Sequence, residues 1–191
     1  MARRNFRRNA GSLPYRKLFV IACEGAKTEQ KYFAIFQKNI KCLPSRKNDS
    51  APLHVLERLK RYLEENRVRK GDEVWLVVDT DNWEEEHLKT LHHWTLTDEQ
   101  YALAVSNPKF EYWLLLHFED GSGVSSARDC VARLKRYMPN YDKNLPTVTK
   151  LKIHVENAIS HAKAKDVPPC SDFPRGRGST VYKLVERLNN T

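Results

Sequence analysis

The chain has 191 residues, long enough for one domain that buries a substantial core. Charged residues make up 30% of it and apolar residues 40%, as in an ordinary soluble globular protein. A formal net charge of +9 favours a polyanionic partner, either nucleic acid or an anionic membrane surface. No apolar stretch approaches the ~20 residues of a spanning helix, and the N-terminus lacks the apolar region of a signal peptide. We therefore expect a cytoplasmic protein without membrane contact.

Residues 1–12 are predicted to be a mobile basic arm or simply a solvated tail. They contain little that a core can bury, together with Arg3, Arg4, Arg7 and Arg8. Without these four arginines the net charge is still +5, so the body of the chain is basic on its own.

The first predicted unit is a strand, a turn and a helix. Residues 17–23 form a continuous apolar run, as expected for a strand covered on both faces. Gly25 permits a tight turn, and Thr28 is expected to cap a helix that runs to about residue 38. The aromatic face of this helix is formed by Tyr32, Phe33 and Phe36. A short strand is expected at residues 40–43.

The middle of the chain alternates helices with strands. Ser50 is expected to cap a helix that has Pro52 in its first turn. The buried stripe of this helix is formed by Leu56, Leu59 and Leu63. A strand, a helix and a further strand follow at residues 74–78, 84–94 and 101–105. The alternation implies right-handed crossovers and a mostly parallel sheet flanked by helices, in a Rossmann-like α/β fold.

The remaining elements are all predicted to be helices, at residues 110–118, 126–138, 148–164 and 180–189. The first of these is apolar almost all round, so we expect it to be buried. The elements divide the chain into a core over residues 13–120 and a helical C-terminal extension over residues 121–191 that packs on the core.

Acidic residues follow three of the predicted strands, namely Glu24 and Glu29, Asp79 and Asp81, and Glu111. Ligand sites of open parallel sheets form at the carboxyl ends of the strands, so we expect these carboxylates to meet. Such a cluster typically holds a divalent cation such as Mg²⁺, which leaves positions for substrate phosphate. Taken singly, Asp79 and Asp81 are also explained as caps of the following turn, and Glu29 as an ordinary first-turn acid stabilised by the helix dipole.

A phosphatase with an aspartate nucleophile explains the sequence less well. That chemistry usually begins after the first strand and requires a hydroxyl residue two places past the second aspartate. Trp83 occupies that place, and the aspartate pair follows a later strand. The phosphatase interpretation also leaves Glu24 without a role.

The four cysteines, Cys23, Cys42, Cys130 and Cys170, form no Cys-x-x-Cys pair. Their wide spacing argues against a zinc site and against a disulfide framework. We expect free thiols in a reducing cytoplasm.

Several motifs carry a resemblance to known families. Glu24-Gly25 after the first strand and Asp79-Thr80-Asp81 after the third resemble the signature of Toprim domains, the metal-dependent catalytic module of topoisomerases, primases and certain nucleases. More narrowly, the chain is similar to the RloB-like family in residues 23–33, 106–118, 141–143 and 180–186. The most specific of these segments contains Asn-Pro-Lys-Phe-Glu-Tyr-Trp-Leu-Leu at residues 107–115. The resemblance covers nearly the whole chain beyond the arm.

The resemblance implies a Toprim-type nuclease of restriction loci and abortive-infection phage defence, with an AAA-type ATPase as a partner. It implies that Asp79 and Asp81 hold Mg²⁺ (or Mn²⁺) together with Glu24. The catalytic residues that it implies are Glu24, Glu111 and Lys143, of which Lys143 contacts phosphate. Because the DNA gates and ATPase modules of larger Toprim enzymes are not recognisable here, strand passage and primer synthesis are not expected.

Nucleic acid is the expected substrate, and DNA and RNA both stay open. The expected substrate contacts are Lys27, Asn107, Arg175 and Arg177. The two arginines alternate with glycines, which predicts either a flexible phosphate-contacting loop or a solvated linker. Trp83 is predicted to pack or to stack a base, and His117 is more typical of a core residue than of a ligand. The alternative function is a non-cleaving regulatory subunit of a defence complex; a third is a toxin-like subunit silenced by its ATPase.

Overall fold

A five-stranded sheet forms the centre of the computed structural model, which describes residues 15–45, 51–80, 83–141 and 148–191. The strand order is β2-β1-β3-β4-β5. The parallel strands are β1 (Phe19–Cys23), β2 (Ile40–Leu43), β3 (Glu73–Asp79) and β4 (Tyr101–Asn107). The edge strand β5 (Gly178–Ser179) pairs with β4 in the antiparallel direction. The predicted Rossmann-like, mostly parallel α/β fold is confirmed.

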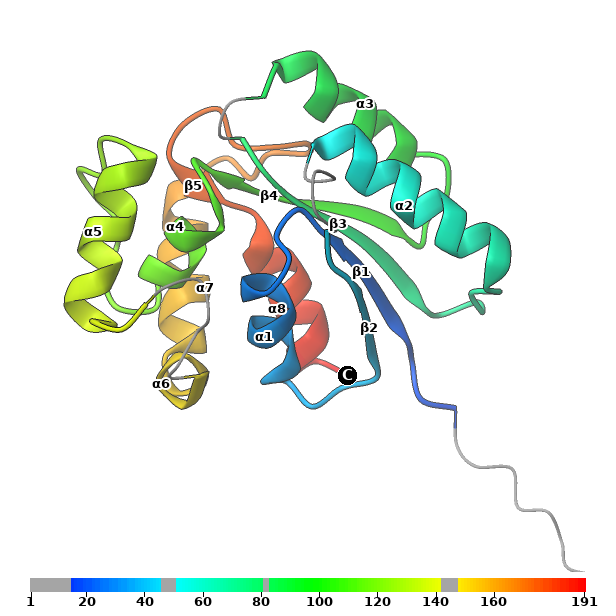
Figure 1. Ribbon diagram of the computed structural model, residues 1–191, viewed down its shortest axis with the longest axis horizontal. Coiled ribbons are helices and arrows are strands. Elements are labelled where there is room, and N and C mark those ends of the chain that lie inside the picture. The colour runs from blue at the N-terminus through cyan, green and yellow to red at the C-terminus, as the bar shows by residue number, and fades with distance from the viewer. Residues whose placement is uncertain (1–14, 46–50, 81–82, 142–147) are drawn as a thin grey trace, which may run out of the picture.

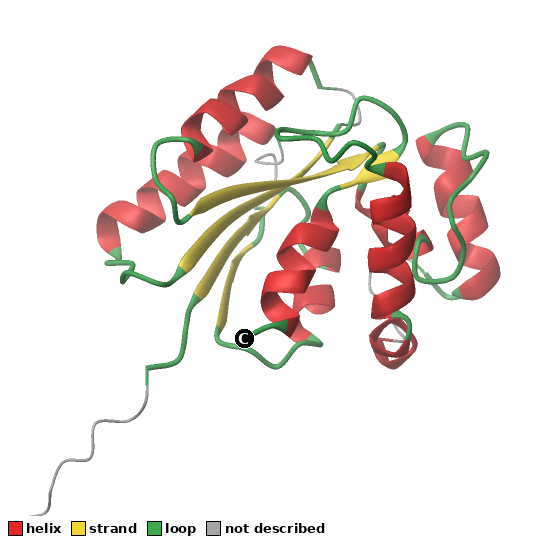
Figure 2. Ribbon diagram, turned by 180° about the vertical axis from the view of Figure 1, so that it is seen from behind, coloured by secondary structure: helices red, strands yellow, loops and turns green. Residues whose placement is uncertain are grey.

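Helices cover both faces of the sheet (Figure 1). One face is covered by α2 (Pro52–Glu65) and α3 (Glu85–Thr95). The other face is covered by α1 (Thr28–Ala34), α4 (Phe110–Leu115), α7 (Val155–Lys165) and α8 (Val181–Asn189). Two further helices, α5 (Ala127–Tyr137) and α6 (Val148–Ile153), lie farther from the sheet on this second side. Figure 2 shows the sheet between the two helical layers from behind.

The side chains of β1 explain why its sequence is apolar without alternation. Phe19, Ile21 and Cys23 point into the core under α1, α4, α7 and α8, and all three are fully buried. Val20 and Ala22 point to the opposite face, into the core under α2 and α3. Because both faces of the strand are covered, every position along it is apolar.

Among the described residues, none of the helices has the length and apolar character that crossing a bilayer requires.

Helix boundaries differ from the sequence-based prediction at several points. Helix α1 ends at Ala34 rather than near residue 38, because the chain turns at Gln37, whose φ is 52°. Thr28 is the first residue of α1 rather than its cap, and Lys27 stands at the cap position. The Thr28 side chain is buried and interacts with Tyr141 instead. Ser50, the predicted cap of α2, lies outside the described residues.

The C-terminal part differs from the prediction in two ways. The helix expected over residues 148–164 is two helices, because the backbone leaves the helical path at His154 between α6 and α7. The strand β5 was not expected from the sequence. It is only two residues long, and it is held by the sheet itself, where Ser106 Oγ and Ser179 Oγ lie 2.9 Å apart.

The strand order creates a switch point between β1 and β3. After β1 the chain moves outward to β2, whereas after β3 it moves in the opposite direction to β4. The two connections diverge, and open α/β sheets bind ligands at such a point, outside the carboxyl ends of the strands. We call this region at the ends of β1 and β3 the crevice. Glu24 directly follows β1, and Asp79 is the last residue of β3.

Candidate metal and nucleic-acid site

Glu24 bridges the ends of the two central strands. Its backbone N–H donates to the carbonyl oxygen of Val77 at 3.0 Å, which continues the pairing of β1 with β3. Its Oε2 accepts a hydrogen bond from the backbone N–H of Asp79 at 3.0 Å, and its Oε1 accepts one from Nε1 of Trp83 at 3.0 Å. Trp83, considered from the sequence for packing or base stacking, therefore holds the Glu24 carboxylate.

Glu29 lies in the first turn of α1 and folds back on the turn that precedes the helix. Its Oε1 accepts a hydrogen bond of 3.0 Å from the backbone N–H of Gly25. A Cβ atom at residue 25 would overlap the Glu29 carboxylate, so glycine is needed there for close approach. The buried Oε2 of Glu29 has no hydrogen-bond partner among the described residues.

The Glu29 carboxyl group has a perturbed acidity. Burial raises its pKa from an ordinary value of 4.5 to about 7, and the charges of Glu111 and Glu24 contribute to the rise. Glu29 is only 4% exposed, so it is not a solvated first-turn acid. A carboxyl group with a pKa near 7 exchanges its proton readily at neutral pH.

Asp79 has a carboxyl group whose pKa is raised well above its ordinary value. Burial is the main cause, followed by the negative charges of Glu24, Glu29 and Glu111; Lys109 acts in the opposite direction. Such mutual effects arise only between charges that lie near one another. Four carboxyl groups therefore lie near one another. They belong to Glu24 in the turn after β1, Glu29 in α1, Asp79 at the end of β3 and Glu111 in α4.

Glu111 is held from two sides in the first turn of α4. Tyr141 donates its hydroxyl to Oε1 of Glu111 at 2.8 Å, and Nζ of Lys109 lies 4.0 Å from Oε2. Glu111 is buried, with 6% of its surface exposed. Tyr141 and Lys109 were not identified from the sequence as contacts of Glu111. Lys109 was detectable as a basic residue two places from Glu111, whereas nothing local relates Tyr141 to a residue 30 positions away.

Other residues expected at the site lie in different surroundings. Asp81 and Lys143 fall outside the described residues, and Lys27 is exposed at the start of α1. The structure joins Arg177 to Asn107: Nη1 of Arg177 donates to Oδ1 of Asn107 at 2.9 Å, and Nη2 donates to the carbonyl oxygen of Ser125 at 2.9 Å. Arg177 therefore ties the loop before β5 to the end of β4.

Arg175 is also engaged within the protein. Its Nη2 donates to Oδ2 of Asp172 at 2.8 Å, and its guanidinium lies 3.9 Å from the ring centre of Phe173.

His117 is a core residue, as its position in the sequence favoured. It is fully buried, its Nε2 lies 3.1 Å from the Tyr32 hydroxyl, and burial lowers its pKa to about 4.

The carboxyl groups of the crevice suit a hard cation such as Mg²⁺. All of their donor atoms are oxygen, the type of ligand that Mg²⁺ prefers. Glu29 Oε2 has no hydrogen-bond partner among the described residues, and burial and neighbouring carboxylates raise the pKa of Glu29 and of Asp79, so a cation would stabilise ionised forms that are otherwise disfavoured. Within the described part of the chain, however, no three histidine, cysteine or acidic side chains are arranged as a complete metal-binding group.

The fold and the crevice define an α/β protein with an acidic, oxygen-rich site at its switch point. The model of the family described as RloB-like protein matches residues 19–188, so the chain belongs to the RloB-like family. This membership supports a role associated with restriction and defence. No curated protein and no solved structure gives a significant match.

Proposed function

We propose that this protein is a Mg²⁺-dependent nuclease of the Toprim type that acts in phage defence by hydrolysing phosphodiester bonds. The observation that carries the proposal is the gathering of Glu24, Glu29, Asp79 and Glu111 at the crevice, where the charges of Glu24 and Glu111 raise the pKa of both Glu29 and Asp79. A protein that only binds polyanions gains nothing from such a cluster. A metal-dependent phosphodiesterase needs it.

The proposed ligands of Mg²⁺ (or Mn²⁺) are Asp79 and Glu24, together with Asp81, which remains a prediction from the sequence. When bound, the cation neutralises phosphate charge and makes a water molecule more acidic. The protein keeps the carboxylates in place: Glu24 is held by the N–H groups of Asp79 and Trp83, and Glu111 by Tyr141. Each carboxylate oxygen has two lone pairs, so accepting one hydrogen bond leaves it able to bind a cation.

Nucleic acid is the proposed substrate because the chain has a net charge of +9. Lys27 is exposed in the turn that follows Glu24, and we propose that it contacts phosphate. Lys143 remains a predicted phosphate contact. A partner ATPase of the AAA type belongs to the same proposal and is supported by the family resemblance.

The proposal is tested by incubating the protein with Mg²⁺ or Mn²⁺ and a panel of plasmid DNA, linear DNA, tRNA and ribosomal RNA. We expect cleavage of at least one substrate, which EDTA abolishes. Glu24→Gln and Asp79→Asn should abolish it while leaving the protein folded. Glu64→Gln, at an exposed position of α2, is the matched control. Full activity in both site variants would contradict the proposal.

The alternative is a non-cleaving, nucleic-acid- or nucleotide-binding subunit of an ATPase-containing defence complex. One observation favours it: among the described residues no complete metal-binding group is assembled. This alternative predicts salt-sensitive binding without any cleavage product.

The third possibility is a nuclease that its ATPase partner silences. In that case product appears only after the two proteins are combined under activating conditions.

A further inference from the structure

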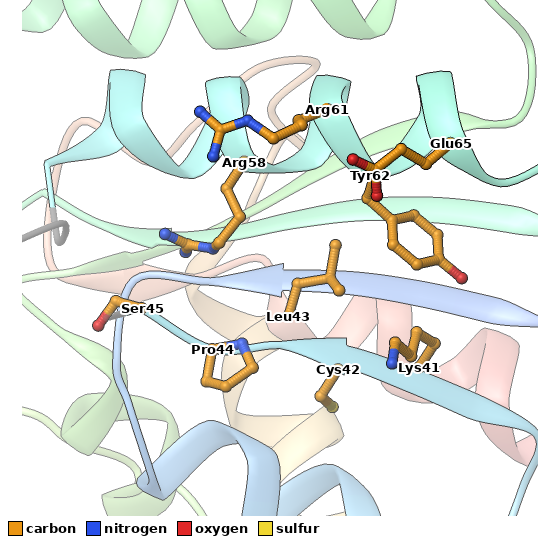
Figure 3. A pocket seen from close by; sticks show the side chains of 9 residues that line it. All are labelled: Lys41, Cys42, Leu43, Pro44, Ser45, Arg58, Arg61, Tyr62 and Glu65. Atoms are coloured by element: carbon orange, nitrogen blue, oxygen red, sulfur yellow. The ribbon is translucent and has the colours of Figure 1, made fainter. Parts of the chain in front are cut away.

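A pocket of about 360 Å³ lies between β2 and α2, at the edge of the sheet (Figure 3). Its volume lies within the range of small-ligand sites in proteins. The β2 side of the pocket includes Lys41 and Leu43, and the α2 side includes Arg58, Arg61 and Tyr62. It is separate from the carboxylates described above, and none of its side chains takes part in the proposed chemistry.

The lining of this β2–α2 pocket is predominantly cationic. Lys41, Arg58 and Arg61 supply three positive charges, against one negative charge from Glu65. Figure 3 shows the guanidinium groups of Arg58 and Arg61 extending toward the same end of the pocket, with Glu65 lying beside Tyr62 farther along. The end of the pocket near the two arginines is therefore suited to an anion.

The cationic end of the pocket adjoins the carboxylate crevice. Nη2 of Arg58 donates a hydrogen bond of 2.6 Å to the carbonyl oxygen of Cys23, the residue before Glu24. The backbone N–H of Ser45 donates to the carbonyl oxygen of Gly25, the residue after Glu24, at 3.3 Å. The same turn thus forms part of the crevice on one side and contacts the pocket lining on the other.

We propose that the β2–α2 pocket binds single-stranded nucleic acid next to the carboxylate crevice. One backbone phosphate lies against Arg58 and Arg61. A base packs on the ring of Tyr62, and a second phosphate of the same strand lies against Lys41, farther along the pocket (Figure 3). Cations that follow the backbone and an aromatic ring that stacks a base are the two parts of a typical single-strand site. The inference rests on the proposed function, because the strand that occupies the pocket is the one whose neighbouring phosphate enters the crevice.

The position of Tyr62 selects for a single strand. The side chain is partly buried between α2 and β2, so only a base that has left its helical stack can reach the ring. Bases of an intact duplex are stacked and paired, and freeing one costs a few kcal/mol. Single strands and unpaired loops present such bases at no comparable cost.

The test is the binding of a short fluorescein-labelled single-stranded oligonucleotide, as DNA and as RNA, measured by fluorescence anisotropy in EDTA. The informative variants are Arg61→Ala and Lys41→Ala, since both residues are exposed; Arg58 also holds the Cys23 carbonyl, and its removal disturbs the turn. Each variant should bind about tenfold more weakly, the effect of losing one charge-assisted hydrogen bond. The slope of log K against log salt should become shallower by about 0.7 for each lost phosphate contact.

The matched control is Arg136→Ala, which removes an exposed arginine from the last turn of α5, outside the pocket. Tyr62→Leu should weaken binding of the oligonucleotide at least about fivefold, but should not affect binding of an otherwise identical strand that carries abasic sites. Thermal unfolding checks that each variant is folded. Equal losses in Arg61→Ala, Lys41→Ala and Arg136→Ala overturn the inference, as does binding of a blunt duplex as tight as that of the single strand.

The outcome is independent of the catalytic proposal. Binding in EDTA requires neither metal nor cleavage, and Glu24→Gln leaves the lining of the pocket unchanged. Single-strand binding that depends on the pocket, together with no cleavage in any metal, contradicts the nuclease and supports the pocket. Cleavage that is unaffected by Arg61→Ala, Lys41→Ala and Tyr62→Leu contradicts the pocket and supports the nuclease.

Discussion

The backbone N–H of Asp79 donates a hydrogen bond of 3.0 Å to Oε2 of Glu24, although the two residues are 55 positions apart in the chain. The contact is possible because β1 and β3 are parallel neighbours whose carboxyl ends coincide, with Cys23 opposite Val77. The orientation of the Glu24 carboxylate is thus set by the main chain of β3. A group held in this way needs little rearrangement when a ligand arrives.

Trp83→Phe should loosen this arrangement without disturbing the sheet. The substitution removes the indole N–H that donates to Oε1 of Glu24 and leaves the contact with Asp79 intact. We expect a loss of about 2 kcal/mol in the free energy of unfolding, typical of a hydrogen bond to a charged group. Metal-dependent cleavage should fall as well. Urea unfolding and initial cleavage rates measure the two effects.

Trp94→Phe is the control for this substitution. Trp94 stacks on Tyr101 with ring centres 4.4 Å apart, and phenylalanine retains an aromatic ring for that stacking. If the two variants lose cleavage activity to the same extent, the hydrogen bond from Trp83 to Glu24 has no special importance.

Tyr141→Phe should destabilise the protein more than the same change at Tyr137. The Tyr141 hydroxyl donates to buried Glu111, whereas the exposed Tyr137 hydroxyl donates to Glu119 at 3.1 Å. Loss of a donor to a buried carboxylate costs about 1–3 kcal/mol, and loss of an exposed one costs much less. Urea unfolding of the two variants at pH 8 gives the comparison. Equal free energies of unfolding would show that the buried hydrogen bond does not stabilise Glu111.

Much of the fold follows from local sequence patterns. The apolar runs predict the strands, and the acidic residues that follow these runs predict the position of the crevice. Both predictions rest on residues that are close together in the chain. Glu24 and Asp79 could therefore be placed at neighbouring strand ends before their contact was known. The Asn-Pro-Lys-Phe-Glu-Tyr-Trp-Leu-Leu segment indicates the family, which composition and periodicity alone do not identify.

The remaining features depend on distant parts of the chain. Tyr141 reaches Glu111 only after α5 has returned the chain to the crevice, and Arg177 reaches Asn107 only because β5 pairs with β4. A two-residue strand such as β5 has no sequence period and forms only against an existing sheet edge. Thr28 fits the preference for an N-cap, yet its side chain interacts with Tyr141 in the buried site. Tertiary contacts override local preference at these positions.

Gly25→Ala should displace Glu29 from the crevice. The new Cβ atom would overlap the Glu29 carboxylate, so either the side chain leaves or the turn shifts. We expect a destabilisation of about 1–3 kcal/mol, typical of overpacking, and a loss of metal-dependent activity. Gly176→Ala is the control, because a Cβ at that position meets no atom within 4 Å. Unchanged activity in Gly25→Ala would mean that the position of Glu29 does not matter for catalysis.

Glu29 should make the stability of the metal-free protein fall as pH rises through neutrality. Its pKa is about 7 in the folded protein and near the ordinary value of 4.5 when unfolded. Between these values the folded state binds more protons than the unfolded state, so the free energy of unfolding decreases with pH. About 3 kcal/mol that is fully present below pH 4.5 is lost once the pH exceeds the folded-state pKa. Asp79, whose pKa is also raised, acts in the same direction.

Glu29→Gln removes one of the two titrating groups and should make this dependence shallower, whereas Glu64→Gln, at an exposed position of α2, should leave it unchanged. Mg²⁺ favours the ionised carboxylates, so under the proposed function it should stabilise the wild-type protein more at pH 8.5 than at pH 5.5. Urea unfolding followed by circular dichroism at both pH values, with Mg²⁺ and with EDTA, separates the two effects. A pH slope in Glu29→Gln as steep as that of the wild-type protein assigns the titration to another group. A slope that becomes shallower in Glu29→Gln without any effect of Mg²⁺ on the wild-type protein establishes a buried acid and argues against a metal at this crevice.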